Sequence, residues 1–262
     1  MRRVKLVLML KRPHHTANPL VQKLEQFVRL SDDDKQALNG IARREVRDIR
    51  ARYDIIHEGA RPDALNLILE GWGCRHKMLE DGRRQIIAFL IPGDLCDLNV
   101  YILRHMDHSI GAITPVKYAQ ITREDFDAMT ESRPRITQAL LWDTLVTGAI
   151  QREWTVNLGQ RSAFERIAHL VCELFIRLRG IGMTTPDGRC QLPLTQNDVA
   201  EATGMTPVHV NRTLQELRAR GLLEWKARDL HVPDLDALMS AGLFDVNYLH
   251  LEHEGAHLDS ND

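Results

Sequence analysis

The chain has 262 residues, of which 44% are hydrophobic and 27% are charged, the composition of a globular protein with one or two domains. Its net charge of −2 argues at first against a nucleic-acid partner. The segment from Asp234 to Asp262, however, contains seven acidic residues and no Lys or Arg. Since the whole chain carries −2 and this segment −7, the rest carries +5, and a mildly basic body is compatible with DNA binding.

The cysteines are scattered and form no C-x-x-C pair, which predicts reduced thiols in the cytoplasm. The pattern argues against a disulfide framework and against a clustered zinc or iron–sulfur site. The four positions are Cys74, Cys96, Cys172 and Cys190. Residues 4–10 are apolar between basic flanks, but the run is short and lacks a small-residue cleavage site, so we expect no export. No stretch is long enough to span a bilayer, and we expect no membrane partner.

Two helices are expected near the N-terminus. Residues 1–19 are predicted to be a flexible segment, followed by a helix at about residues 20–29. A second helix is predicted to begin after Ser31, whose hydroxyl can cap it. The three aspartates that follow Ser31 favour the positive end of the helix dipole.

From about Arg43 to Thr122 the hydrophobic period shifts to two, which predicts β-strands. Glu80-Asp81-Gly82 is typical of a hairpin turn, and Pro92-Gly93-Asp94 marks another tight turn. Many short strands with Gly and Pro turns predict a small barrel or sandwich, and we assign residues 20–122 to it. The expected strands are residues 65–70, 74–79, 84–91, 109–114 and 117–122.

Residues 123–158 are expected to be helical, with Pro134 as a break or a first-turn residue. Beyond Pro134, apolar residues recur at helical spacing. These are Ile136, Leu140, Leu141, Leu145 and Ala149. Packing of this stripe against the β-domain of the same chain is one interpretation. We favour a symmetric pair of these helices from two chains, because the DNA-binding unit predicted in the next part of the chain usually works as a dimer.

Residues 194–217, LTQNDVAEATGMTPVHVNRTLQEL, have the spacing of a helix-turn-helix. Ala200 is small enough to let two helices cross closely, and Gly204 suits the left-handed backbone of the turn. Thr206 can cap the second helix, and Pro207 fits its first position. Val210, Leu214 and Leu217 form the buried stripe of this helix, and Val208, His209, Arg212 and Gln215 the opposite face. A helix with this exposed face is expected to enter a DNA major groove.

Two short strands are expected after the helix-turn-helix, at residues 221–225 and 230–232. An amphipathic helix at residues 161–179 and a loop at residues 180–189 precede it. A helix-turn-helix followed by a β-hairpin is a winged helix, so we assign residues 159–233 to a DNA-binding domain.

This order of elements resembles the Crp/Fnr family of bacterial transcription regulators, over nearly all of the chain between residues 20 and 232. The resemblance is carried by Gly59, Leu69-Glu70-Gly71, Asp81-Gly82, Pro92-Gly93-Asp94 and the run LTQNDVAEATGMTPVHVNRTLQELRARGLLE. It implies an α+β fold. An N-terminal antiparallel β-roll of eight strands (jelly-roll-like) would form a sensor-like domain, followed by a long dimerisation helix at residues 123–158 and a C-terminal winged helix-turn-helix.

The resemblance also implies a homodimer that reads a near-palindromic site in double-stranded DNA, with RNA polymerase as a further partner. Arg212 corresponds to the family's groove arginine, and a bidentate contact to guanine O6 and N7 is its expected role. His209 and Val208 are the other candidates for base readout. The candidates for contacts with the phosphates of the DNA backbone are Thr195, Thr206 and Asn211. For His209 and these three, a helix cap or a solvated side chain is the alternative.

Nucleotide-binding relatives hold the cyclic nucleotide with a Gly-Glu pair and an Arg-Ser pair. Here these positions read Asp97-Leu98 and His108-Ser109. The glycine, the ribose carboxylate and the arginine are therefore replaced, and Asp97 would repel a phosphate. We expect no cyclic nucleotide and no cofactor. Asp97, Leu98, His108 and Ser109 are left as the candidate pocket for an unknown effector.

Two groups of side chains have the chemistry of metal ligands. His105 and His108 lie near Cys96 and Asp97 in the sequence, but an exposed polar loop is the favoured interpretation. The second group lies in residues 234–262, which we expect to form an acidic, solvated tail. It consists of His250, His253 and His257. We therefore predict no metal site.

The sequence predicts a dimeric, sequence-specific DNA-binding regulator with the β-roll as sensor or scaffold. The alternative is a small-molecule or metal-sensing β-roll module whose DNA-binding domain is secondary. An enzyme is not expected, because the chain has no nucleophile elbow, HExxH, P-loop or paired-carboxylate signature.

Overall fold

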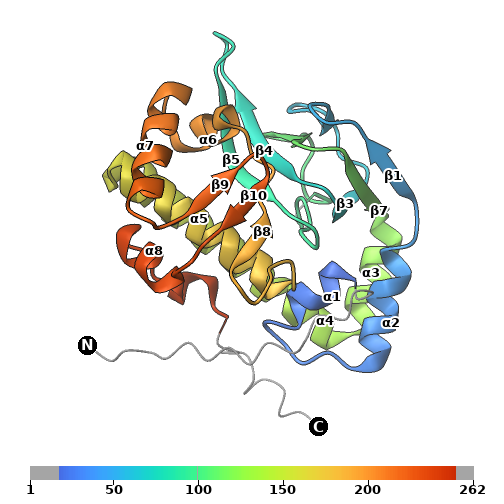
Figure 1. Cartoon of the computed structure of the whole chain (residues 1–262). Helices are drawn as coiled ribbons and strands as arrows, with labels where there is room; N and C mark the ends of the chain where they lie inside the picture. Colours follow the sequence, from blue (N-terminus) through green and yellow to red (C-terminus); the bar gives the residue numbers. More distant parts are fainter. Residues whose placement is uncertain (1–17, 99, 252–262) are drawn as a thin grey trace.

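The computed structural model describes residues 18–98 and 100–251 (Figure 1). Two helices begin the described chain, α1 (Pro19–Leu24) and α2 (Asp32–Ile41). The first is shorter than the helix predicted at residues 20–29. The second begins as expected: the Ser31 hydroxyl accepts a hydrogen bond from the Asp34 N–H, and the Asp34 carboxylate accepts one from the Ser31 N–H.

The β-roll consists of two antiparallel sheets, with strand orders β1-β7-β3 and β2-β6-β4-β5. Between residues 46 and 121 the described residues form seven strands, against the eight that the resemblance implied, and Leu95 forms only an isolated bridge with Leu67. The strands are β1 (Val46–Ile49), β2 (Asp54–Ile56), β3 (Leu65–Glu70), β4 (Gly73–Met78), β5 (Arg84–Leu90), β6 (Ser109–Ala112) and β7 (Val116–Ile121). The predicted hairpin turn at residues 80–82 joins β4 to β5.

The predicted helix at residues 123–158 is two helices, α3 (Arg123–Ser132) and α4 (Pro134–Gln160). Pro134 is the first residue of α4, where its missing N–H costs no intrahelical hydrogen bond. Helix α4 packs against α3, α1 and β5, so the longest helix of the chain lies beside its own β-roll.

The C-terminal unit begins with α5 (Ala163–Gly180) and continues with α6 (Gln196–Thr203) and α7 (Pro207–Ala219). The two predicted wing strands are β9 (Glu224–Lys226) and β10 (Asp229–His231). A third strand, β8 (Arg189–Gln191), pairs with β10 and makes this sheet three-stranded. Our prediction of a loop ended at residue 189 and missed this strand, because three residues are too few to show a period.

The prediction of a solvated tail is wrong for residues 235–251. Helix α8 (Leu235–Ala241) packs against α5, and the 3-10 helix η1 (Val246–Leu249) packs against α4. Phe244 and Leu249 are buried, and the His250 ring lies 5.9 Å from the Trp142 ring. His253 and His257 lie outside the described residues.

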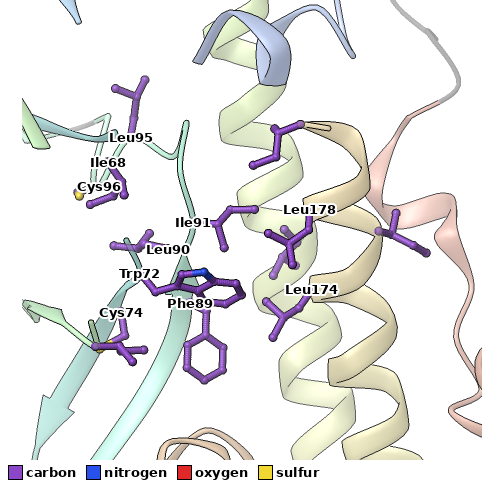
Figure 2. Close-up of a cluster of buried hydrophobic side chains, with 14 of the residues drawn as sticks. Ile68, Trp72, Cys74, Phe89, Leu90, Ile91, Leu95, Cys96, Leu174 and Leu178 are labelled. Atoms are coloured by element: carbon purple, nitrogen blue, oxygen red, sulfur yellow. The ribbon is translucent and has the colours of Figure 1, made fainter. Parts of the chain in front are cut away.

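The β-roll and the C-terminal helices share one hydrophobic core. Figure 2 shows Leu174 and Leu178 of α5 opposite Phe89 and Ile91 at the end of β5. Phe89 also makes an edge contact with Trp154 of α4, with ring centroids 5.9 Å apart. Helix α5 contacts both α6 and α7, and α6 also contacts β5 directly, so the C-terminal helices are packed onto the β-roll. Among the described residues, no helix combines the length and the apolar character needed to cross a membrane.

Candidate DNA-binding surface and β-roll pocket

The helix-turn-helix is formed by α6 and α7, and a sharp turn at Gly204 joins them. Gly204 adopts φ +65°, a left-handed backbone that favours glycine, and its N–H caps α6 by donating to Ala200 O. The Thr206 hydroxyl accepts a hydrogen bond from the His209 N–H at the start of α7, and Pro207 is the first residue of that helix. Gly204, Thr206 and Pro207 thus have the local roles that the sequence predicted.

One face of α7 is buried and the other is open to solvent. Val210, Leu214 and Leu217 are buried against the rest of the unit, whereas Val208 is 72% exposed. The exposed face also carries His209, Arg212 and Gln215. Within the described part of the chain, the Arg212 guanidinium has no hydrogen bond and no ion pair. Its donors are available to an external partner, and α7 lies at the edge of the molecule (Figure 1).

The three residues predicted to contact the DNA backbone differ in how many of their hydrogen-bonding groups already have partners within the chain. The Thr195 hydroxyl and N–H both donate to Asp198 Oδ2, at 2.7 and 2.8 Å, which closes a capping box at the start of α6. Both donors of Thr195 are thus used within the chain, and its contact with a phosphate stays a prediction. The Thr206 hydroxyl oxygen accepts the His209 N–H, and its proton can still be donated to a phosphate. Asn211 accepts a hydrogen bond from Gln196 at 3.3 Å and keeps its amide N–H groups for other partners.

Helix α6 is held against the β-roll by two ion pairs that no local sequence pattern predicts. Arg52 makes a bidentate contact with Asp198, with an Nη2 to Oδ2 distance of 3.0 Å. Arg84 of β5 lies 2.9 Å from Glu201. Burial opposes the ionisation of Asp198, but the hydrogen bonds from Arg52 and Thr195 outweigh it and hold its pKa below the usual value.

The predicted dimer-helix residues of α4 divide between two environments. Ile136, Leu140 and Ala149 are buried within their own chain, so the prediction that they face a second copy is wrong. Leu141 and Leu145 are 62% and 53% exposed. Both line an open groove of about 550 Å³ beside α3. The row of side chains that contains Ile136 and Leu140 is buried in the chain's own core. The adjacent row, which contains Leu141 and Leu145, is exposed and available to a second copy.

The predicted effector residues contact one another and their neighbours in the chain. The His108 Nδ1 donates a hydrogen bond to the Asp107 carboxylate, 2.7 Å away, and its Nε2 lies 3.9 Å from Asp97. The Ser109 hydroxyl accepts a hydrogen bond from the Glu58 N–H at 2.9 Å. Leu98 packs on the hydrophobic core. A carboxylate and a histidine therefore lie side by side at this place, and the absence of a cyclic nucleotide stays a prediction.

A cavity of about 60 Å³ lies elsewhere, between β5, α1, α4, α5 and the C-terminal segment. None of Asp97, Leu98, His108 and Ser109 lines it. Its charged lining includes Lys23, Arg75, Asp94, Asp143 and Arg177, and Leu249 and Leu251 of the C-terminal segment close one side.

Four of these charged groups form ion pairs with one another, whereas Arg75 donates to the Cys96 carbonyl oxygen at 2.8 Å. Lys23 Nζ lies 2.8 Å from Asp94 and 2.6 Å from Asp143. Arg177 lies 2.7 Å from Asp94, which also accepts the Ile91 N–H at 2.8 Å. Burial opposes the ionisation of Asp94, but Lys23 and Arg177 hold its pKa below the usual value.

Glu173 extends this network to the C-terminal segment. It is fully buried and accepts hydrogen bonds from Trp154 Nε1 at 3.1 Å and from the Tyr248 hydroxyl at 3.0 Å. Arg177 lies 3.6 Å from its carboxylate. Burial raises the pKa of Glu173. In the sequence these residues look like ordinary helix and turn positions, and no local pattern could have found the network.

The described residues contain no group of three or more His, Cys, Asp or Glu side chains arranged to hold a metal ion. Near the 105–108 loop, burial raises the pKa of the Cys96 thiol to about 12.

Comparison with known proteins places both parts of the chain. Residues 46–133 match the cyclic nucleotide-binding domain, and residues 165–241 match the Crp-like helix-turn-helix domain. The nitrogen fixation regulation protein FixK of Bradyrhizobium diazoefficiens is 33% identical over 60% of this chain. That alignment spans 64% of FixK, less than two thirds of its length.

The transcriptional activatory protein AadR of Rhodopseudomonas palustris is 30% identical over 70% of this chain and 73% of its own. Among solved structures, FixK2 from Bradyrhizobium japonicum superimposes with a TM-score of 0.65 over 75% of this chain and 96% of its own, at 23% identity. With two domain models matched in the expected order and AadR aligned over more than two thirds of both chains, the chain belongs to the Crp/Fnr family of transcription regulators.

Proposed function

We propose that the protein is a homodimer that binds a near-palindromic DNA site through α7 and thereby regulates transcription. The observation that carries this proposal is the open face of α7, where an exposed arginine with no partner among the described residues stands in the first half of a capped helix. Arg212 is the proposed reader of guanine, and Val208 and His209 are its neighbours for base contacts. Thr206 and Asn211 are the proposed phosphate contacts.

The test is selection of bound duplexes from a random pool by the full-length protein. We expect a two-fold symmetric sequence with half-sites one helical turn, about 34–36 Å, apart. Binding should weaken as salt rises, because phosphate contacts release counterions. Recovery of duplexes with no shared or symmetric sequence would contradict the proposal.

The proposed dimer contact is the exposed stripe of α4. Leu141 and Leu145 are followed along the same face by Arg152 and Val156, which are also exposed. Apolar residues at this spacing, left uncovered on the longest helix, are suited to pairing with the same stripe of a second copy across a two-fold axis.

Replacing Leu141 and Leu145 together with glutamate is expected to weaken dimerisation at least about 30-fold, because burying one leucine contributes roughly 1.5–3 kcal/mol. Sedimentation velocity over a concentration series measures the change. Leu79→Glu is the matched control, since Leu79 is 50% exposed at the β4–β5 hairpin, away from α4. A double variant that dimerises like the wild type would exclude this stripe.

RNA polymerase is the further partner that we propose, on the strength of the family resemblance. The β4–β5 hairpin offers an exposed apolar surface for such a contact, because Met78 and Leu79 are 52% and 50% exposed near its tip. Transcription by purified polymerase from a template carrying the selected site tests this step. Replacing both residues with serine should change transcript yield without changing DNA affinity.

We further infer that the β-roll serves this function without a cyclic nucleotide. The cavity of about 60 Å³ is far below the roughly 300–1,000 Å³ of ordinary small-molecule sites and suits ordered water. Lys23 and Arg177 of its lining are already paired with carboxylates, and Arg75 already donates to a backbone carbonyl. This observation supports a scaffold role over the alternative of a small-molecule sensor.

A further inference from the structure

The side chain of Arg166 contacts both the end of α4 and the end of α6. Arg166 stands in the first turn of α5, immediately after the Arg161–Ser162 link that separates α4 from α5. Its Nε donates to Asn157 O at 3.0 Å, and its Nη2 donates to Leu158 O at 3.0 Å and to Arg161 O at 2.9 Å.

The same guanidinium also reaches α6. Arg166 Nη1 donates to Thr203 O at 2.8 Å, and Thr203 is the last residue of α6, directly before the turn into α7. The last carbonyls of a helix have no partner within the helix and carry its negative dipole end. One cation therefore joins the C-terminal ends of α4 and α6.

Two further contacts hold the same junction. The Asn157 side-chain amide donates back to Arg166 O at 3.2 Å. The Leu158 side chain lies beside the Gly204 turn, since a β-carbon placed on Gly204 would be 3.6 Å from Leu158 Cδ2. The end of α4 thus lies against the turn that sets the direction of α7.

We propose that Arg166 is a positioning residue that fixes the recognition helix relative to α4, and so sets the distance between the two half-sites that a dimer can bind together. The inference rests on the proposed dimeric DNA binding through α7. Only a planar guanidinium can donate at the same time to the carbonyl oxygens at the end of α4 and to that at the end of α6. A lysine ammonium is a point charge and cannot reach all four carbonyls.

In a two-fold dimer with α4 at its centre, this junction is the direct link from α4 to the recognition helix, beside the ion pairs that hold α6 on the β-roll. Binding at the second half-site is then intramolecular, and a rigid connection gives a gain of about 10²–10⁴ in affinity when the spacing fits. A loosened junction loses this gain at the correct spacing and tolerates incorrect spacings better. The contacts of one α7 with one half-site are unaffected.

The experiment measures the affinity of wild type, Arg166→Gln and Arg166→Lys for a set of duplexes. The set holds the selected full site, the same half-sites moved apart or together by one and two base pairs, and a single half-site. Wild type should prefer one spacing sharply. Both variants should lose at least about tenfold at that spacing and show a flatter profile, with half-site affinity nearly unchanged.

Arg123→Gln is the matched control, because Arg123 is exposed on α3 and its ion pair is with Asp127, 3.4 Å away on the same helix. Thermal unfolding and sedimentation confirm that each variant is folded and dimeric, and Arg166→Lys keeps the charge if the glutamine variant unfolds. A variant with the wild-type spacing profile, or with equal losses on half-site and full site, would overturn the inference. If wild type itself prefers no symmetric site, the proposed function fails instead.

Discussion

Replacing Arg212 with alanine is expected to lower affinity for the selected palindrome by about 30-fold to 10⁴-fold, and to leave binding to unrelated DNA nearly unchanged. A bidentate arginine–guanine pair contributes roughly 1–3 kcal/mol of discrimination, and a dimer has two of them. The side chain has no internal partner among the described residues, so its removal leaves the folded chain without a broken contact. Titrations against the selected site and a scrambled site measure the two affinities.

Arg220→Ala is the matched control for this variant. Arg220 caps the other end of α7, where its guanidinium pairs with Glu216. The N-terminal part of a recognition helix contacts the bases, so Arg220 is expected to affect both duplexes alike. If Arg212→Ala weakened both duplexes by the same factor, Arg212 would be a phosphate contact and the assignment of base readout would be wrong.

Replacing Asp94 with alanine is expected to lower the free energy of unfolding by about 3–5 kcal/mol, because removing one partner leaves buried charge uncompensated. Asp94 is 3% exposed and pairs with both Lys23 and Arg177. Denaturant unfolding at neutral pH measures the loss. Asp127→Ala is the matched control, since Asp127 forms an exposed ion pair with Arg123 and should change stability by less than about 0.5 kcal/mol.

Acid should reduce the difference between wild type and Asp94→Ala. The pKa of Asp94 is lowered in the folded chain, so its ionised form adds stability above the usual value of 3.8, and that contribution is lost as pH falls through the folded pKa. The two unfolding free energies should therefore converge below about pH 4. An equal loss at pH 7 and in acid would show that Asp94 acts through packing and not through its charge.

Local sequence patterns predicted the helix-turn-helix well because its determinants are local. Thr206, Pro207 and Gly204 act on backbone groups within a few residues, and the stripe from Val210 to Leu217 needs only the helical period. The hairpin of β4 and β5 followed from its turn for the same reason. The family itself, confirmed by the comparisons, followed from these local features and their order.

The errors concern contacts between residues far apart in the chain. The stripe of α4 contains two adjacent apolar rows, and nothing in the sequence tells which row faces the β-roll, so Ile136 and Leu140 were assigned to the wrong partner. The acidic composition of the C-terminal segment concealed Phe244 and Leu249, which bury themselves against distant helices. Asp94 looked like a turn residue because both of its cations lie about 70 or more positions away.

The core that α5 shares with the β-roll has a thermodynamic consequence. Leu174 and Leu178 cannot leave Phe89 and Ile91 without exposing apolar surface on both sides, so the two parts of the chain are linked in a single folding equilibrium (Figure 2). Anything that binds the folded β-roll alone adds its binding free energy to the whole unit, the DNA-reading helices included. A ligand of the β-roll is therefore expected to raise the unfolding temperature of α6 and α7 together with that of the β-roll.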